Sequence, residues 1–166
     1  MRYGQIRKYD VANGPGIRTS FFVTGCSANC KNCFNTEYMN PNYGKLWTEK
    51  ETDLIIDYLK KDEIEGLTIL GGEPFESVRD LIEIVRKIRD KSDKSIWIFS
   101  GFKYEVLVNN KESKKLLSMC DVLVDGLFVE ELKNLKLKFK GSSNQRTIDI
   151  QKSLEKNKIC ILDGYK

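Results

Sequence analysis

Segments rich in β-branched and aromatic residues alternate with amphipathic segments along most of this 166-residue chain. The β-rich segments are short and apolar, whereas the segments between them repeat apolar residues every three or four positions, as a buried helix face requires. Strands that alternate with helices predict right-handed βαβ units and a parallel sheet with helices outside. The expected strands are 17–24, 67–70, 96–99, 122–124, 147–150 and 158–162. The first expected helix begins at the capping box formed by Thr48 and Glu51. The other expected helices are 76–91, 104–117 and a short helix through Leu154.

The chain length limits how far such a sheet can close. A complete eight-stranded barrel takes about 250 residues, so this chain can build only part of one. We therefore expect an α/β fold, either a partial (β/α) barrel or an open curved sheet, with five or six mostly parallel strands and outer helices. One domain over residues 1–166 is expected, because single domains most often have about 100–150 residues.

Composition excludes several classes of site. The chain has no histidine, which removes catalysis by a histidine base, mixed Cys/His zinc sites and haem held by histidine. Its net charge of +4 is modest and does not argue for direct nucleic-acid binding, because dedicated binders concentrate more positive charge on one face. It has no apolar segment of about 18 residues and no apolar secretion signal near its start, so we expect a soluble, cytoplasmic protein without a membrane partner.

Three of the five cysteines lie in one short loop directly after the first expected strand. Cys26, Cys30 and Cys33 have the spacing C-x3-C-x2-C, which favours metal binding over disulfides in a cytosolic chain. Three thiolates would bind three corners of a four-iron cube and leave one iron open, so the spacing indicates a reactive cluster. A structural zinc site and a ferredoxin-like electron carrier are the alternatives, but zinc sites usually pair two knuckles and ferredoxins use four cysteines per cluster. Cys120 and Cys160, which could complete such sites, lie in apolar surroundings and are expected to behave as small buried hydrophobes.

Small or acidic residues follow each of the other expected strands. Functional groups of parallel α/β folds gather at the carboxyl ends of the strands, so these segments and the cysteine loop should face one mouth. Any one of them by itself is better explained as an ordinary turn, but the cysteine triplet at the same edge favours function for the set. In 71–74, Gly-Gly-Glu-Pro, the glycines would let a ligand lie against backbone and Glu73 could pair with an ammonium group. The other segments are Ser100-Gly101, Asp125-Gly126 and Asp163-Gly164.

Together these motifs resemble a known superfamily. The cysteine triplet, with Gly-Gly-Glu-Pro following it at residues 71–74, is similar to the radical S-adenosylmethionine enzymes, and 13–18, Asn-Gly-Pro-Gly-Ile-Arg, resembles their glycyl-radical activating members. Segments 97–102, 122–128 and 141–146 resemble the family of activating proteins of anaerobic ribonucleoside-triphosphate reductase. The resemblance spans about residues 3–150. Asn32 departs from it, because many members of the superfamily have an aromatic residue before the third cysteine and the close relatives often have glycine. The tail after Ile150 matches no motif.

The resemblance implies a radical S-adenosylmethionine fold and its chemistry. Cys26, Cys30 and Cys33 would be the metal ligands of a [4Fe-4S] cluster, catalytic through that cluster, with S-adenosylmethionine chelated to the fourth iron. Reduction by flavodoxin or a similar low-potential donor would cleave S-adenosylmethionine into methionine and a 5′-deoxyadenosyl radical. That radical would take hydrogen from a glycine Cα on the large subunit of the anaerobic reductase. The resemblance leaves open whether the chain forms a homodimer or a heterotetramer with the reductase.

The resemblance also implies contacts to S-adenosylmethionine. Gly71, Gly72 and Glu73 are expected to contact the methionyl ammonium. Asn32 and Phe34 are expected to contact the adenine. Ser100, Asp125 and Gly126 are expected to lie over the ribose or the methionyl end. Arg18, Arg146 and the basic segment 133–140 could face the reductase or a carboxylate. For Arg18 a structural ion pair is at least as good an explanation, and for 133–140 a solvated face is the better one. Segment 141–146 is expected to dock a partner or order a loop. The remaining alternative is an activase of pyruvate formate-lyase or of another glycyl-radical enzyme, which segment 141–146 and the short chain disfavour.

Overall fold

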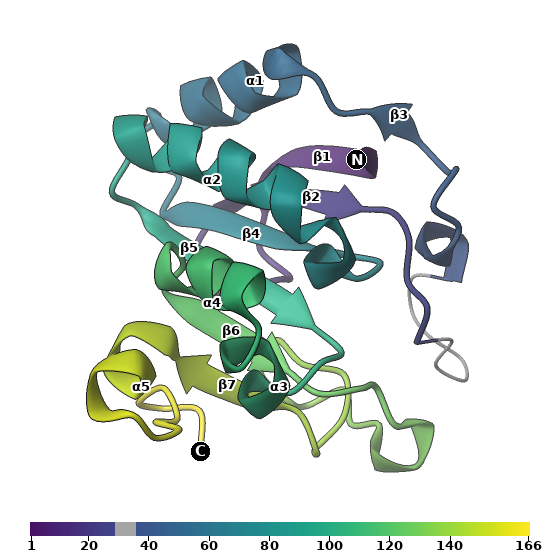
Figure 1. Ribbon diagram of the computed structural model, residues 1–166, viewed down its shortest axis with the longest axis vertical. Coiled ribbons are helices and arrows are strands. Elements are labelled where there is room, and N and C mark those ends of the chain that lie inside the picture. Colours follow the sequence, from purple (N-terminus) through teal and green to yellow (C-terminus); the bar gives the residue numbers. More distant parts are fainter. Residues whose placement is uncertain (29–35) are drawn as a thin grey trace.

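The computed structural model describes residues 1–28 and 36–166 of the chain. Within this part, seven strands form one mixed sheet with the order β3-β1-β2-β4-β5-β6-β7 (Figure 1). The strands are β1 (Arg2–Asp10), β2 (Arg18–Val23), β3 (Lys45–Leu46), β4 (Gly66–Gly71), β5 (Ser95–Ser100), β6 (Val122–Asp125) and β7 (Arg146–Asp149). The helices are η1 (Thr36–Met39), α1 (Glu49–Leu59), η2 (Pro74–Ser77), α2 (Val78–Lys91), α3 (Tyr104–Val108), α4 (Lys111–Ser118), η3 (Glu130–Leu132) and α5 (Ile150–Lys156).

The centre of the sheet matches the expected βαβ pattern. Strands β2, β4, β5 and β6 are parallel neighbours, and the connections between them carry α1, α2 and the α3–α4 pair. The α/β class is confirmed. The carboxyl ends of these four strands therefore lie at one edge, which we call the carboxyl edge, and their amino ends form the opposite amino edge.

Both sides of the sheet depart from expectation. The sheet has seven strands in the described residues, rather than five or six, and β1 and β7 are antiparallel to their neighbours β2 and β6. Strand β1 is polar at most positions and lacks the alternation that would reveal it in the sequence. The segment that precedes β7, residues 126–145, contains only the three-residue η3 and lacks the α-helix that usually carries a parallel crossover. The sheet is not closed, and the expected partial barrel is not confirmed.

Two further expectations were wrong in detail. Residues 158–162 form only an isolated bridge, between Ile161 and Ile148 of β7, rather than a last strand. The helix expected over 104–117 is divided into α3 and α4, because the side chain of Asn110 accepts a hydrogen bond from the amide of Ser113 and caps α4 as a new helix. The longest helix, α2, has 14 residues, and no helix in the described ranges is long and apolar enough to span a bilayer.

Different elements pack against the two faces of the sheet. Figure 1 shows α1, α2 and α4 lying in a row over one face. Alternate strand residues, such as Phe21, Ile69 and Ile98, point to this face and are fully buried with the apolar sides of the helices. The intervening residues, such as Phe22 and Phe99, point to the other face, where loops and the carboxyl-terminal tail pack. Among the described residues no α-helix packs on this second face, which we call the loop-covered face, and it has room for a ligand.

Candidate functional site

The cysteine loop begins between two other chain segments at the carboxyl edge. After β2, the amide of Gly25 donates to the carbonyl of Tyr38 at 2.7 Å and the amide of Cys26 to that of Met39 at 3.1 Å. On the other side, the amide of Glu73 donates to the carbonyl of Gly25 at 2.8 Å. These bonds fix the backbone of Cys26 beside the end of β4. The other candidate residues in the loop, Cys30, Cys33, Asn32 and Phe34, lie outside the described residues.

The glycine pair after β4 is required by close backbone packing. Gly71 has φ +122°, and a Cβ there would lie 2.4 Å from the carbonyl oxygen of Val23. A Cβ on Gly72 would lie 2.6 Å from the carbonyl oxygens of Gly25 and Tyr38. Side chains at either position would push the end of β4 away from the cysteine loop, so the glycines bring the two segments together.

Glu73 is a buried carboxylate that joins the ends of β4 and β5. Its side chain is 2% exposed and accepts hydrogen bonds from the amide of Phe75 at 3.0 Å, the hydroxyl of Ser100 at 2.9 Å and the amide of Gly101 at 2.7 Å. Burial raises the pKa of Glu73 to about 7, even though the three hydrogen bonds favour the ionised form. The donors from described residues are neutral, so they leave the negative charge of the ionised carboxylate uncompensated. A cation bound beside Glu73 would be attracted to this charge and would lower the pKa of the carboxyl group.

A cavity of about 130 Å³ connects these elements. The expected mouth is confirmed for four strand ends, since residues after β2, β4, β5 and β6 all line it. The fifth segment, Asp163-Gly164, does not line it, because residues 158–162 lie beyond β7 and the tail then turns back to place Tyr165 against Trp97. The lining residues include Cys26, Gly71, Gly72, Glu73, Ser100, Gly101, Gly126, Leu127, Phe128 and Gln145.

Asp125 lies at this edge, but its carboxylate is held by other protein groups. It is fully buried and accepts hydrogen bonds from the guanidinium of Arg146 at 2.5 and 3.0 Å and from the amide of Tyr104 at 2.7 Å. Arg146 also pairs with Glu105 at 2.6 Å, and the bond to Asp125 raises the pKa of Arg146. The expectation that Arg146 meets a carboxylate is confirmed. The neighbour of Asp125, Gly126, lines the cavity with φ +103°.

Segment 141–146 orders the loop that follows β6. The side chain of Asn144 donates to the carbonyl of Leu127 at 2.8 Å, and that of Gln145 donates to the carbonyl of Gly126 at 2.9 Å. The sequence motif indicated a docking or ordering role for the segment, and these contacts support ordering. It did not identify Gln145 as a cavity residue. The position of Gln145 follows from the register of β6 and β7, which pairs Asp125 with Arg146 and so places Gln145 beside Gly126.

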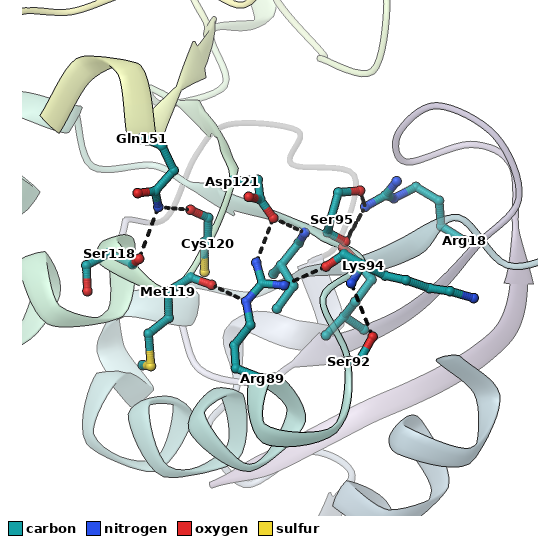
Figure 2. A network of polar contacts seen from close by, with 12 residues as sticks. Arg18, Arg89, Ser92, Lys94, Ser95, Ser118, Met119, Cys120, Asp121 and Gln151 are labelled. Atoms are coloured by element: carbon teal, nitrogen blue, oxygen red, sulfur yellow. Dashed lines mark hydrogen bonds and ion pairs between the residues drawn. The ribbon is translucent and has the colours of Figure 1, made fainter. Parts of the chain in front are cut away.

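Arg18 lies at the amino edge, away from this cavity. It is 1% exposed, and its guanidinium donates to the carbonyl of Leu67 at 3.0 Å and the hydroxyl of Thr68 at 2.9 Å. It also donates to the carbonyl of Ser95 at 2.9 Å (Figure 2). Burial lowers its pKa to about 10. The expectation that Arg18 faces a partner is wrong, because it is buried, and its hydrogen bonds go to neutral oxygens rather than to the expected carboxylate.

The two remaining cysteines do not join Cys26. Cys120 is fully buried just before β6 at the amino edge, and burial raises the pKa of its thiol to about 12. Cys160 is half-buried, and its thiol donates to the carbonyl of Lys158 at 3.7 Å. No group of three or more metal-binding side chains occurs within residues 1–28 and 36–166. In that part of the chain, nothing offers Cys26 the further ligands of a structural zinc site.

Known proteins match this chain over most of its length. A family model described as a 4Fe-4S single cluster domain matches residues 12–148. Proteins named anaerobic ribonucleoside-triphosphate reductase-activating protein are 37% identical in Escherichia coli (strain K12) and in Haemophilus influenzae, over 150 residues that cover 87% of this chain and 96% of each relative. The protein of that name in Enterobacteria phage T4 is 34% identical over 149 residues, which cover 88% of this chain and 92% of the relative. The chain therefore belongs to the family of anaerobic ribonucleoside-triphosphate reductase-activating proteins and carries the 4Fe-4S single cluster domain.

Proposed function

We propose that this chain is a radical S-adenosylmethionine activase that generates a glycyl radical on an anaerobic ribonucleoside-triphosphate reductase. The observation that carries the proposal is the position of Cys26. Its loop is bonded to the end of β4 and lines the same cavity as Gly71, Gly72 and Glu73. A metal cluster and a carboxylate that attracts an ammonium group would then lie on two walls of one site.

The residues present fit a [4Fe-4S] cluster. Thiolates are the usual ligands of such clusters, and the loop supplies them through Cys26, Cys30 and Cys33. When bound and reduced, the cluster supplies the electron that cleaves S-adenosylmethionine and yields the 5′-deoxyadenosyl radical. The chain has no histidine, and hydrogen-atom transfer from a glycine Cα needs no protein acid or base.

Roles for the site residues follow from their positions. Glu73 would attract the methionyl ammonium electrostatically, while its bonds to Ser100 and Gly101 keep the two strand ends together. Gly71 and Gly72 would offer backbone to the methionyl end, and Gly126 would form the opposite wall. Asp125 would act indirectly, by fixing that wall through Arg146. Asn32 and Phe34, which flank the third cysteine, are proposed to contact the adenine.

The wider arrangement is also a proposal. A single domain over 1–166 would curve its open sheet around S-adenosylmethionine as part of a barrel and meet the large reductase subunit at the carboxyl edge. Flavodoxin, or another low-potential protein, would reduce the cluster in the cytoplasm. The active assembly would contain either a homodimer of this chain or a heterotetramer with the reductase.

The test is an anaerobic reconstitution followed by a comparison of substrates. We expect about four irons per chain, as one cubane cluster requires, and a change in the electron paramagnetic resonance signal of the reduced cluster when S-adenosylmethionine is added. Mixing with reductant, S-adenosylmethionine and the anaerobic reductase should give a glycyl radical doublet. A doublet on pyruvate formate-lyase alone would overturn the choice of target, and a colourless protein with one tightly bound zinc would overturn the cluster.

A further inference from the structure

A second, larger cavity lies on the loop-covered face of the sheet and adjoins the cavity of about 130 Å³, which we call the cofactor cavity. It has a volume of about 410 Å³ and lies between the turn after β1, the central strands and segment 134–141. Four residues, Leu70, Phe99, Phe128 and Gln145, line both cavities. Of these four, Gln145 alone has a polar side chain, so any directed bond across the shared wall has to come from it or from backbone.

The carboxamide of Gln145 bonds to both sides of this wall. Its oxygen accepts from the amides of Gly141 at 2.8 Å and Ser142 at 3.1 Å, and its nitrogen donates to the carbonyl of Gly126 at 2.9 Å. Gly141 lines the larger cavity, and Gly126 lines the cofactor cavity. One planar group therefore fixes the distance between the rim of one cavity and the wall of the other.

The wall itself depends on the same segment. The carbonyl of Leu127 accepts from Asn144, and the amide of Val129 donates to the hydroxyl of Ser142 at 3.2 Å. The side chain of Leu127 projects toward the cofactor cavity, where a Cβ on Gly101 would lie 2.9 Å from it. A movement of residues 141–145 would therefore be transmitted to Gly126 and Leu127 through directed hydrogen bonds.

We propose that Gln145 is a positioning residue that couples occupancy of the larger cavity by the glycine-bearing segment of the reductase to the geometry of the cofactor cavity. This inference rests on the proposed function. A peptide that enters the larger cavity meets the rim at Lys140, Gly141 and Gln145, and the carboxamide relays its position to Gly126. Cleavage of S-adenosylmethionine would then be tied to the presence of the glycine, which limits wasted radicals.

The test compares Gln145→Ala and Gln145→Glu with the matched control Gln151→Ala. Gln151 also uses one carboxamide to bind two carbonyl groups, those of Ser118 at 3.0 Å and Cys120 at 2.8 Å, but it does so at the amino edge (Figure 2). Gln145→Glu retains acceptors for Gly141 and Ser142 and loses the donor to Gly126. It therefore separates the bond across the wall from the bonds within segment 141–145, and it serves if Gln145→Ala fails to fold.

The reconstituted proteins are mixed with reductant, S-adenosylmethionine and reductase, and 5′-deoxyadenosine released and glycyl radical formed are both counted. We expect their ratio to rise about tenfold in both Gln145 variants, the effect of one lost hydrogen bond to a buried carbonyl, and to stay at the wild-type value in Gln151→Ala. Amide hydrogen exchange of residues 126–129, measured without reductase, should also be faster in both Gln145 variants than in Gln151→Ala.

The outcomes separate the inference from the proposed function. If wild-type protein forms glycyl radical but the Gln145 variants keep its ratio, or change it only as much as Gln151→Ala does, the coupling role is overturned. If wild-type protein forms no glycyl radical on the reductase, the proposed function fails first. A loss of stability shared by all three variants leaves the ratio as the deciding measurement, because a purely structural role would lower both products together.

Discussion

One carboxylate at each edge of the central sheet is stabilised in a different way. At the amino edge, Arg89 donates to the carboxylate of Asp121 at 2.6 Å and to the carbonyls of Met119 at 2.8 Å and Lys94 at 2.6 Å (Figure 2). Asp121 in turn accepts from the amide of Ile96 at 2.8 Å. At the carboxyl edge, the carboxylate of Glu73 is more deeply buried, and the described residues give it neutral donors.

This difference shows which of the two carboxylates, Asp121 or Glu73, has its charge compensated without a ligand. The pair of Arg89 and Asp121 compensates its charge within the protein and joins helix α2 to the starts of β5 and β6. Glu73 has hydrogen bonds but no cation from the described residues, which is why burial raises its pKa to about 7. A site that binds an ammonium group benefits from such a carboxylate, because the ligand supplies the charge that the protein leaves out.

The largest expected effect comes from the cysteines of the two edges. We expect Cys26→Ala and Cys30→Ala to abolish reductive cleavage of S-adenosylmethionine, because each removes a cluster ligand, and to lower the iron content after reconstitution. Cys120→Ala, at the amino edge, should leave cleavage largely intact and cost about 1 kcal/mol of stability, as small core truncations do. Iron analysis measures the cluster content of each variant, and methionine release measures the cleavage of S-adenosylmethionine. Loss of cleavage in Cys120→Ala would mean that the ligand assignment is incomplete.

At the amino edge, the largest expected effect is on stability. Arg18→Met removes a buried cation and leaves the oxygens of Thr68, Leu67 and Ser95 without this donor. We expect the free energy of unfolding to fall by about 2–3 kcal/mol, because buried oxygens left without a donor cost more than the removal of the buried charge returns. The affinity of the folded fraction for S-adenosylmethionine should not change. Denaturant titration and equilibrium binding measure the two quantities, and a selective loss of affinity would contradict the division between the edges.

The parts of the fold that the sequence predicted are those with strong local patterns. Apolar runs identified β2, β4, β5 and β6, and the regular spacing of apolar residues identified α2. Strand β1 was missed because its stability comes from pairing with β2 and from the turn that Asp10 fixes, where its carboxylate accepts from the amide of Ala12 and the hydroxyl of Ser20. Such partners are distant or irregular in the sequence, so no periodicity reveals them.

The candidate site shows the same division. Residues that follow a strand, such as Gly72 and Ser100, could be placed at the carboxyl edge from topology alone. The direction of a side chain could not, and Asp125 is an example, because its carboxylate binds Arg146 from a strand whose antiparallel direction the pattern did not give. Gln145 was missed for the same reason, since its place beside Gly126 depends on that register.

Glu73 gives a pH-dependent prediction at the carboxyl edge. Its folded pKa of about 7 is above the usual value of 4.5, so the native state binds more protons between these values and stability falls as pH rises through them. We expect the protein without S-adenosylmethionine to lose about 2 kcal/mol of stability between pH 5 and pH 8, and Glu73→Gln to lose much less. Denaturant titrations at both pH values measure this. An equal loss in the variant would assign the dependence to another group.

Glu76 gives the smallest expected effect and tests how the carboxyl edge holds the cysteine loop. Its carboxylate accepts from the amide of Ser27 at 3.0 Å and from the Ser27 hydroxyl, and so ties the residue after Cys26 to η2. We expect Glu76→Gln to accelerate iron loss to a chelator about threefold, because an exposed bond of this kind contributes little. The matched control is Glu112→Gln, which breaks an exposed ion pair with Arg79 on the helical face. Equal rates of iron loss in the two variants would show that the bonds between Glu76 and Ser27 do not hold the loop.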